Sequence, residues 1–173
     1  MHLESTIRTV PDFPKPGIMF KDITTMLKDP AAFRECIDRF EQMYRGMGVQ
    51  KVVAIESRGF IIGAALADRL GAGFVPVRKP GKLPAAVLRE EYALEYGTDA
   101  IEIHTDAVLK GEKVLLHDDV LATGGTMKAA SSLVERLGGE IVGLSFIIEL
   151  AFLSPRTKLP GYDIRSLITY DAE

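Results

Sequence analysis

The sequence predicts an α/β fold: a twisted, mostly parallel central sheet with helices on both faces. Short apolar strands alternate with amphipathic helices along the chain, and residues 141–148 form an almost unbroken apolar run. Such alternation is typical of parallel sheets, and a continuous apolar run is typical of an interior strand that is buried on both faces. Ligands of these sheets bind beyond the carboxyl ends of the strands, so the turns that follow the strands are the first candidates for a site.

The composition is that of an ordinary globular chain. Its 173 residues, 47% hydrophobic and 26% charged, suit a single domain over residues 1–173. A net charge of −3 with scattered Lys and Arg argues against nucleic-acid binding, and no apolar run is long enough for a membrane span. The first residues lack the apolar core of an export signal and Cys36 is the one cysteine, so we expect a cytoplasmic protein.

Residues 1–30 are expected to form an irregular segment ahead of the first long helix. Prolines and apolar side chains are dense between residues 10 and 29. The segment is either a strap that covers the core or a hood over a planar apolar ligand, with Phe20 as the stacking face. Asp29 and Pro30 then start a helix as N-cap and first helical residue. Cys36 lies on this helix and is expected to be a buried thiol, because no catalytic partner is identifiable.

Two strand ends carry charged turns. The strand at 51–55 runs into Glu56, Ser57 and Arg58, which form either a plain connection or a loop in which Arg58 and backbone amides bind phosphate oxygens. The strand at 74–77 runs into a turn whose cations favour an anionic ligand; these are Arg78, Lys79 and Lys82.

Residues 80–98 are expected to form a hairpin-like excursion and a candidate mobile flap. Gly81 and Gly97 bracket it, and Glu95 and Tyr96 are polar groups near its end. A short strand at 100–104 and a turn follow. The three histidines share no metal-ligand spacing with one another or with the cysteine, so none is expected to bind a metal.

The stretch 114–127 is the most informative part of the chain. A buried strand is expected to precede Asp118 and Asp119, and a small-residue turn then opens an amphipathic helix; the turn comprises Ala122, Thr123, Gly124, Gly125 and Thr126. Backbone N–H groups at the start of a helix bind phosphate, and carboxylates accept hydrogen bonds from ribose hydroxyls. The pattern therefore indicates a site for ribose 5-phosphate, although a tight turn with solvated acids is the alternative.

This stretch resembles the phosphoribosyl pyrophosphate motif of the type I phosphoribosyltransferases. Residues 13–22, 56–60, 78–84 and 94–97 extend the resemblance, being similar to the hood, the pyrophosphate loop and the flap borders of the members that use adenine. The resemblance implies that Asp118 and Asp119 hold the ribose hydroxyls and that residues 122–126 hold the 5-phosphate. It also implies a set of pyrophosphate residues: Glu56, Ser57, Arg58, Arg78, Lys79 and Lys82.

Further roles come from the same resemblance. Phe20 would stack on the purine, and backbone groups of Met19 and Lys21 would read its edge. Glu95 would be a general acid/base on the flap beside Tyr96, so the implied catalytic residues are Glu95, Arg58, Asp118 and Asp119. The resemblance further implies a cis peptide bond between Glu56 and Ser57, a homodimer, and Mg²⁺ that is bound mainly through the substrate.

The implied reaction belongs to purine salvage: adenine and phosphoribosyl pyrophosphate give AMP and pyrophosphate. One alternative is the same transfer to another base, such as hypoxanthine, guanine, xanthine or orotate. A second alternative is a non-catalytic regulator that senses phosphoribosyl pyrophosphate and binds DNA. Such a regulator should carry an added DNA-binding domain or a basic face, and neither is evident in the sequence.

Overall fold

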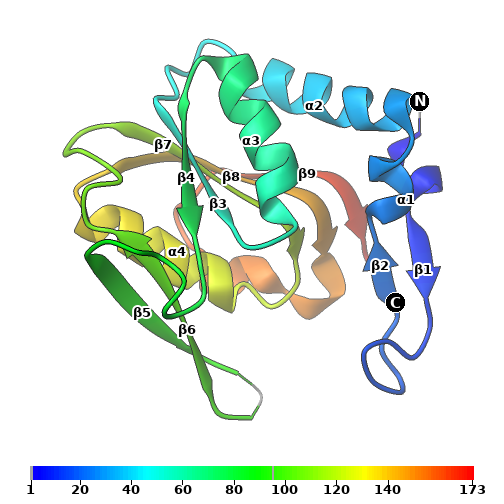
Figure 1. Ribbon diagram of the computed structural model, residues 1–173. Coiled ribbons are helices and arrows are strands. Elements are labelled where there is room, and N and C mark those ends of the chain that lie inside the picture. Colours follow the sequence, from blue (N-terminus) through cyan, green and yellow to red (C-terminus); the bar gives the residue numbers. More distant parts are fainter. Residues whose placement is uncertain (1, 95) are drawn as a thin grey trace.

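The structure, a computed structural model, describes residues 2–94 and 96–173. Its centre is a parallel sheet of five strands in the order β4-β3-β7-β8-β9 (Figure 1). The strands are β3 (Lys51–Ile55), β4 (Gly73–Val77), β7 (Lys113–Leu121), β8 (Glu140–Leu150) and β9 (Ile164–Tyr170). This confirms the predicted sheet.

Helices cover both faces of the sheet, as predicted (Figure 1). They are α1 (Thr24–Leu27), α2 (Pro30–Tyr44), α3 (Gly59–Leu70) and α4 (Gly125–Arg136), with 3-10 turns at Leu3–Thr6, Ala151–Leu153 and Pro155–Lys158. Successive strand residues point to opposite faces, so Val52 packs into the core under α2 and α3, whereas Val53 packs into the core under α4. Within the described ranges no helix combines the length and hydrophobicity of a membrane span, and the cytoplasmic location stays a prediction.

The start of α2 follows from local chemistry. Asp29 Oδ1 accepts hydrogen bonds from the backbone N–H groups of Ala31 at 2.8 Å and Ala32 at 3.2 Å, and Pro30 occupies the first helical position. Cys36 is fully buried on this helix. Burial raises the pKa of its thiol to about 12, so the thiolate is scarce, as expected for a structural cysteine.

The N-terminal segment is more regular than predicted. β1 (Arg8–Val10) and β2 (Phe20–Asp22) form an antiparallel ribbon in which Val10 lies opposite Phe20. Arg8 binds the carboxylate of Asp22, which also accepts a bond from the Thr24 N–H at 2.8 Å. The Arg8 and Thr24 bonds lower the pKa of Asp22 to about 2. This pairing ties the ribbon to the start of α1.

The predicted excursion is a hairpin, which confirms the sequence interpretation of its shape. β5 (Val87–Ala93) pairs antiparallel with β6 (Thr98–His104), so the second arm includes the strand that was expected to stand alone at 100–104. Arg136 of α4 anchors the hairpin, because its Nη1 donates to the Arg89 carbonyl at 2.9 Å and pairs with Glu90 at 3.0 Å. Glu95 lies outside the described residues.

Two strands run further than the sequence suggested. β7 continues to Leu121, so Asp118 and Asp119 lie inside the strand rather than after it. β8 continues to Leu150, so Glu149 does not end it. Both extensions have one cause: β7 and β8 stay paired past the acids, with Leu121 opposite Glu149. Backbone pairing does not require the apolar side chains that mark a strand in the sequence.

Candidate active site

A pocket of about 630 Å³ lies at the carboxyl edge of the sheet. The turn after β3, the loop after β4 and the acids of β7 all contribute to it, as the strand order predicts. Eleven predicted site residues line this pocket: Met19, Phe20, Lys21, Glu56, Ser57, Arg58, Lys79, Asp118, Asp119, Ala122 and Thr126. The fold therefore brings together the hood, the pyrophosphate loop and the ribose motif.

The other predicted residues that the structure describes are not among those that line this pocket. Thr123 and Gly124 line a small cavity of about 80 Å³ that shares Asp118, Ala122 and Thr126 with the main pocket. Gly125 lies at the start of α4, where an added Cβ would be 3.7 Å from Cδ2 of Tyr92. Of the flap residues, Tyr96 is 82% exposed at the hairpin tip. Glu95 is among the residues that the structure does not describe.

Arg58 holds one of the two acids. Its Nε donates to Asp119 Oδ2 at 2.5 Å, and the Asp119 side chain is only 7% exposed. The Asp119 N–H in turn donates to Asp118 Oδ1 at 2.9 Å. Asp118 retains some exposure to the pocket, yet its burial within the sheet and the neighbouring Asp119 charge raise its pKa well above the ordinary value. The two adjacent acids therefore sit in different environments, one of them paired with a cation.

The turn between β3 and α3 comes close to these acids. The peptide bond between Glu56 and Ser57 is cis, as the resemblance implied. α3 begins at Gly59, where an added Cβ would lie 3.0 Å from Asp118 Oδ1 and 3.3 Å from the His117 carbonyl oxygen. A side chain at this position would push α3 away from β7. Glycine therefore allows Arg58 to reach the acids.

The turn before α4 leaves the first N–H groups of the helix without a side-chain cap. Gly124 is the N-cap residue with φ +88°, a conformation that suits glycine. An added Cβ there would lie 2.8 Å from the Pro155 carbonyl oxygen, so the turn also packs tightly. A glycine has no side chain with which to cap the helix, so the first N–H groups of α4 receive no bond from it. Uncapped N–H groups at the start of a helix are suited to binding phosphate, and the 5-phosphate site at this turn stays a prediction.

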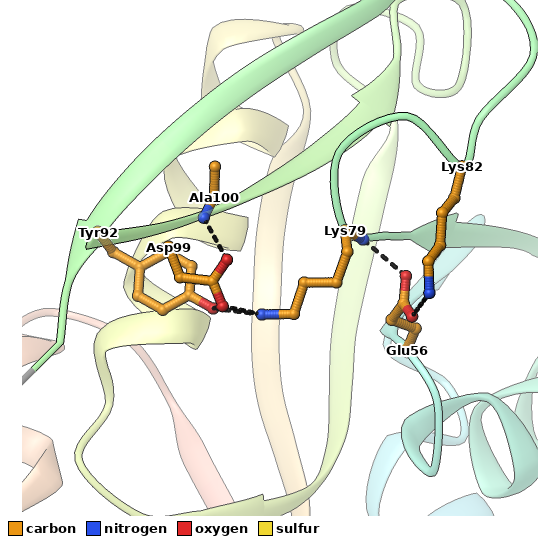
Figure 2. Close-up of polar contacts among 6 residues, drawn as sticks. All are labelled: Glu56, Lys79, Lys82, Tyr92, Asp99 and Ala100. Carbon is orange, nitrogen blue, oxygen red and sulfur yellow. Dashed lines mark hydrogen bonds and ion pairs between the residues drawn. The ribbon is translucent and has the colours of Figure 1, made fainter. Parts of the chain in front are cut away.

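Glu56 binds several residues of the cationic loop after β4. Its carboxylate accepts hydrogen bonds from the Lys79 backbone N–H at 2.6 Å and from Lys82 Nζ at 2.9 Å (Figure 2). The same carboxylate lies 3.4 Å from Arg78 Nε. Burial alone would raise the pKa of Glu56, but the Lys79 and Lys82 bonds outweigh it and lower the pKa. Arg78 and Lys82 are thus engaged by Glu56 and are not among the residues that line the main pocket.

The hood supplies the aromatic wall. The Phe20 ring packs edge-to-face on Phe13, with centroids 5.1 Å apart, and the Arg58 guanidinium lies 5.4 Å from the Phe20 centroid. Lys21 directs its ammonium elsewhere, over the Tyr170 ring at 4.2 Å. Lys21 is among the residues that line the pocket, and contact of its backbone with the purine stays a prediction.

Sequence reasoning missed part of the apolar lining. Tyr92, Val120, Leu150 and Leu153 all line the pocket. A signal for two of them was present: β8 is an apolar strand of a parallel sheet, so the residues at its carboxyl end, Leu150 and the turn to Leu153, should face the site.

His117 is a buried group directly behind the acids. Its Nδ1 lies 2.9 Å from Ser145 Oγ, which donates to the Leu116 carbonyl at 3.1 Å, and its ring packs on the edge of Phe40. Burial lowers the pKa of His117 from 6.5 to about 4. Among residues 2–94 and 96–173, no group of three His, Cys, Asp or Glu side chains is arranged to hold a metal ion.

We expect His117 to make the protein acid-sensitive. Between pH 6.5 and 4 the unfolded chain binds a proton at His117 that the folded chain excludes. The free energy of unfolding should therefore decrease as the pH falls through this window, by up to about 3 kcal/mol from this group. Urea denaturation at pH 7 and 4.5 measures the decrease, and His117→Gln should show a smaller one. Equal decreases in both proteins would contradict the prediction.

The fold and the site define a phosphoribosyltransferase. The phosphoribosyl transferase domain family matches residues 23–159. Adenine phosphoribosyltransferase of Kosmotoga olearia is 56% identical over 98% of this chain and 100% of the relative. The crystal structure of the Thermoanaerobacter pseudethanolicus enzyme covers 97% of this chain and 98% of its own, with 56% identity and a TM-score of 0.95.

A third similar protein is the Saccharomyces cerevisiae adenine phosphoribosyltransferase in complex with adenine and a bisphosphate, D-DIAB. It is 39% identical, with a TM-score of 0.90 over 95% of this chain and 96% of its own. The chain belongs to the adenine phosphoribosyltransferases.

Proposed function

We propose that this chain forms AMP and pyrophosphate from adenine and phosphoribosyl pyrophosphate by seating the substrates on three elements of one pocket. The observation that carries the proposal is the single pocket of about 630 Å³ that joins Phe20, Arg58, Asp119 and Thr126. The Phe20 ring suits a purine, and the Arg58 cation suits a diphosphate. The Asp119 carboxylate suits the ribose hydroxyls, and the turn that contains Thr126 suits the 5-phosphate.

The ribose 5-phosphate would bind across the end of β7. The turn at residues 122–126 would donate N–H and hydroxyl groups to the phosphate, with the start of α4 adding its favourable dipole. Asp118 and Asp119 would accept hydrogen bonds from the ribose hydroxyls. The shared boundary of the main pocket and the small cavity supports this placement, because Asp118, Ala122 and Thr126 line both.

The diphosphate would lie toward the turn after β3 and the loop after β4. Arg58 and Lys79 line the pocket there and can donate to phosphate oxygens. Arg78 and Lys82, which form ion pairs with Glu56, would add positive charge near the diphosphate from the same loop. When bound, Mg²⁺ would add positive charge beside Arg58 and Lys79 and so help to stabilise the departing diphosphate. The described residues contain no cluster of three metal-binding side chains, so substrate oxygens and water would supply most of the six Mg²⁺ ligands, and no dedicated set of protein ligands is expected.

The purine would lie against the Phe20 ring. The Arg58 guanidinium is 5.4 Å from that ring, whereas a planar base needs about 3.5 Å on each side. Arg58 would therefore shift when the base binds on its face of Phe20. Apolar side chains of Val120, Leu150 and Leu153 complete this part of the pocket.

Transfer of the ribose 5-phosphate to the purine depends mainly on stabilising the charge that develops on the ribose and on the diphosphate. As the bond from ribose C1 to the diphosphate breaks and purine N9 approaches, positive charge develops on the ribose ring. With the ribose bound at the end of β7, the Asp119 carboxylate would stabilise that charge. Glu95 would act as general acid/base toward the purine, and closure of the flap would keep water from the activated sugar.

A direct assay tests this function. The purified protein with Mg²⁺ and phosphoribosyl pyrophosphate should convert adenine to AMP, measured by chromatography. Hypoxanthine, guanine, xanthine and orotate serve as competing bases. If one of these bases reacts faster than adenine, that base is the preferred substrate. If the protein binds phosphoribosyl pyrophosphate but converts no base, it is a regulator rather than an enzyme.

Phe20→Ala should raise the KM for adenine about tenfold, because it removes a stacking surface that contributes about 1–3 kcal/mol per base. The KM for phosphoribosyl pyrophosphate should stay near the wild-type value, since the sugar donor binds at the other end of the pocket. Phe13→Ala is the comparison variant: Phe13 packs against Phe20 but is not among the pocket-lining residues, so it should raise the KM for adenine less than Phe20→Ala does. Equal effects on both KM values would mean that Phe20 shapes the hood rather than binds the base.

We further propose that the protein is a homodimer. The family resemblance implies it, and Ile61 of α3 and Phe74 of the edge strand β4 leave apolar surface 43% and 37% exposed on the described chain. Light scattering after size exclusion should give twice the chain mass of 18.9 kDa. A mass equal to one chain would exclude the dimer.

A further inference from the structure

Lys79 is held by two residues of the hairpin. Its ammonium pairs with the Asp99 carboxylate and donates to the Tyr92 hydroxyl at 3.0 Å, and the hydroxyl donates to Asp99 Oδ2 at 3.2 Å (Figure 2). The three polar groups thus form a closed ring of contacts. Lys79 and Tyr92 line the main pocket, so this ring lies at the wall of the site and not on a remote surface.

The hairpin presents the two acceptors side by side on one face. Tyr92 of β5 lies directly opposite Asp99 of β6 in the strand register, and directly opposed side chains lie on one face of the ribbon. Asp99 Oδ1 accepts the Ala100 N–H at 2.8 Å, which fixes its carboxylate. The Tyr92 ring lies against the turn before α4, 3.7 Å from the position of a Cβ on Gly125.

An ammonium group has three N–H donors. Asp99 and Tyr92 account for two of them, which leaves one for a ligand in the pocket. Resting on the proposed function, we infer that Asp99 and Tyr92 are positioning residues for diphosphate recognition. They hold Lys79 so that its third donor meets an oxygen of the leaving diphosphate. Burial by itself lowers the pKa of Lys79, but the contact with Asp99 outweighs it and keeps the ammonium charged.

If Asp99 instead competes with the diphosphate for Lys79, the expected effect of removing Asp99 is reversed. Its removal would then free the cation and tighten binding. Positioning is favoured because both acceptors belong to one hairpin and one of them also packs on the phosphate turn. Lys79 therefore has no need to leave them in order to reach the ligand.

The test compares Asp99→Asn and Tyr92→Phe with wild type. We expect either variant to weaken Mg²⁺-dependent binding of phosphoribosyl pyrophosphate in calorimetry about tenfold, the size of one lost charged hydrogen bond. The KM for pyrophosphate in the reverse reaction should rise by a similar factor, and the KM for adenine should not change. Asp99→Glu should restore part of the affinity, because it returns the carboxylate.

Asp106→Asn is the matched control, since it removes one exposed carboxylate just beyond β6 and should behave as wild type. Tyr92→Phe keeps the aromatic ring, so it tests the inference even if Asp99→Asn unfolds. Unchanged or tighter diphosphate binding, or an equal rise in the KM for adenine, would overturn the inference. Wild-type protein that binds the donor but uses no base would refute the proposed function alone, because calorimetry still decides the role of Asp99.

Discussion

Asp119→Ala is expected to lower turnover about a thousandfold, the upper end of what one preorganised charge stabiliser supplies. Its carboxylate is nearly buried at the pocket wall and is oriented by Arg58 at 2.5 Å. A charge that is already oriented and shielded from water stabilises the developing positive ribose strongly. Steady-state assays with saturating adenine and phosphoribosyl pyrophosphate measure the loss.

The fold should survive this change, because the Asp119 side chain faces the pocket rather than the core. Thermal unfolding checks this point. Asp119→Asn keeps the shape and removes the charge, so it should be nearly as inactive as the alanine variant. Asp38→Ala on α2 is the control: this surface acid pairs with Arg69 and its loss should leave turnover intact. Normal activity of Asp119→Ala would remove the residue from the catalytic machinery.

Arg58→Ala is expected to reduce kcat/KM by about 30- to 800-fold, which corresponds to about 2–4 kcal/mol of transition-state stabilisation. Arg58 is placed for two tasks. It lines the pocket where the diphosphate would leave, and it orients Asp119. Arg58→Lys keeps the charge but loses the planar fork, so its activity should lie between wild type and Arg58→Ala.

The double variant separates the two tasks. Because Arg58 and Asp119 touch, the loss in Arg58→Ala/Asp119→Ala should be smaller than the sum of the single losses in free energy. The shared part is the orientation of Asp119. Strictly additive losses would show that Arg58 acts on the diphosphate alone, and normal activity of Arg58→Ala would exclude both roles.

Much of the architecture was predictable because its signals are local. The strands and helices of residues 51–70 and 114–136 can be predicted from the spacing of apolar side chains along the chain. The helix start at Asp29 and Pro30 can be predicted from the capping side chain of Asp29 and the first helical position of Pro30. The position of the site was predictable too, since parallel strands bring their carboxyl ends to one edge. Periodicity failed where a strand is defined by pairing alone, as at Asp118 and Asp119 in β7.

The partners of the charged residues were not predictable. Lys79, Lys82 and Arg78 look alike in sequence as cations of one turn. In the folded chain Glu56 holds two of them, and the hairpin pair of Tyr92 and Asp99 holds the third at the pocket wall. These contacts join residues 13 to 26 positions apart, and no local pattern specifies which carboxylate reaches which cation.

The α/β class, the family resemblance and the sheet edge at which the polar turns meet all follow from the amino-acid sequence. Backbone propensity, side-chain periodicity and turn chemistry act over a few residues, so they can be read along the chain. The tertiary structure was needed to show that Arg58 pairs with Asp119, that Tyr92 lines the pocket, and that Asp99 reaches Lys79. Ion pairs and pocket walls depend on distances between elements, and these distances exist only after the sheet, the hood and the hairpin have packed.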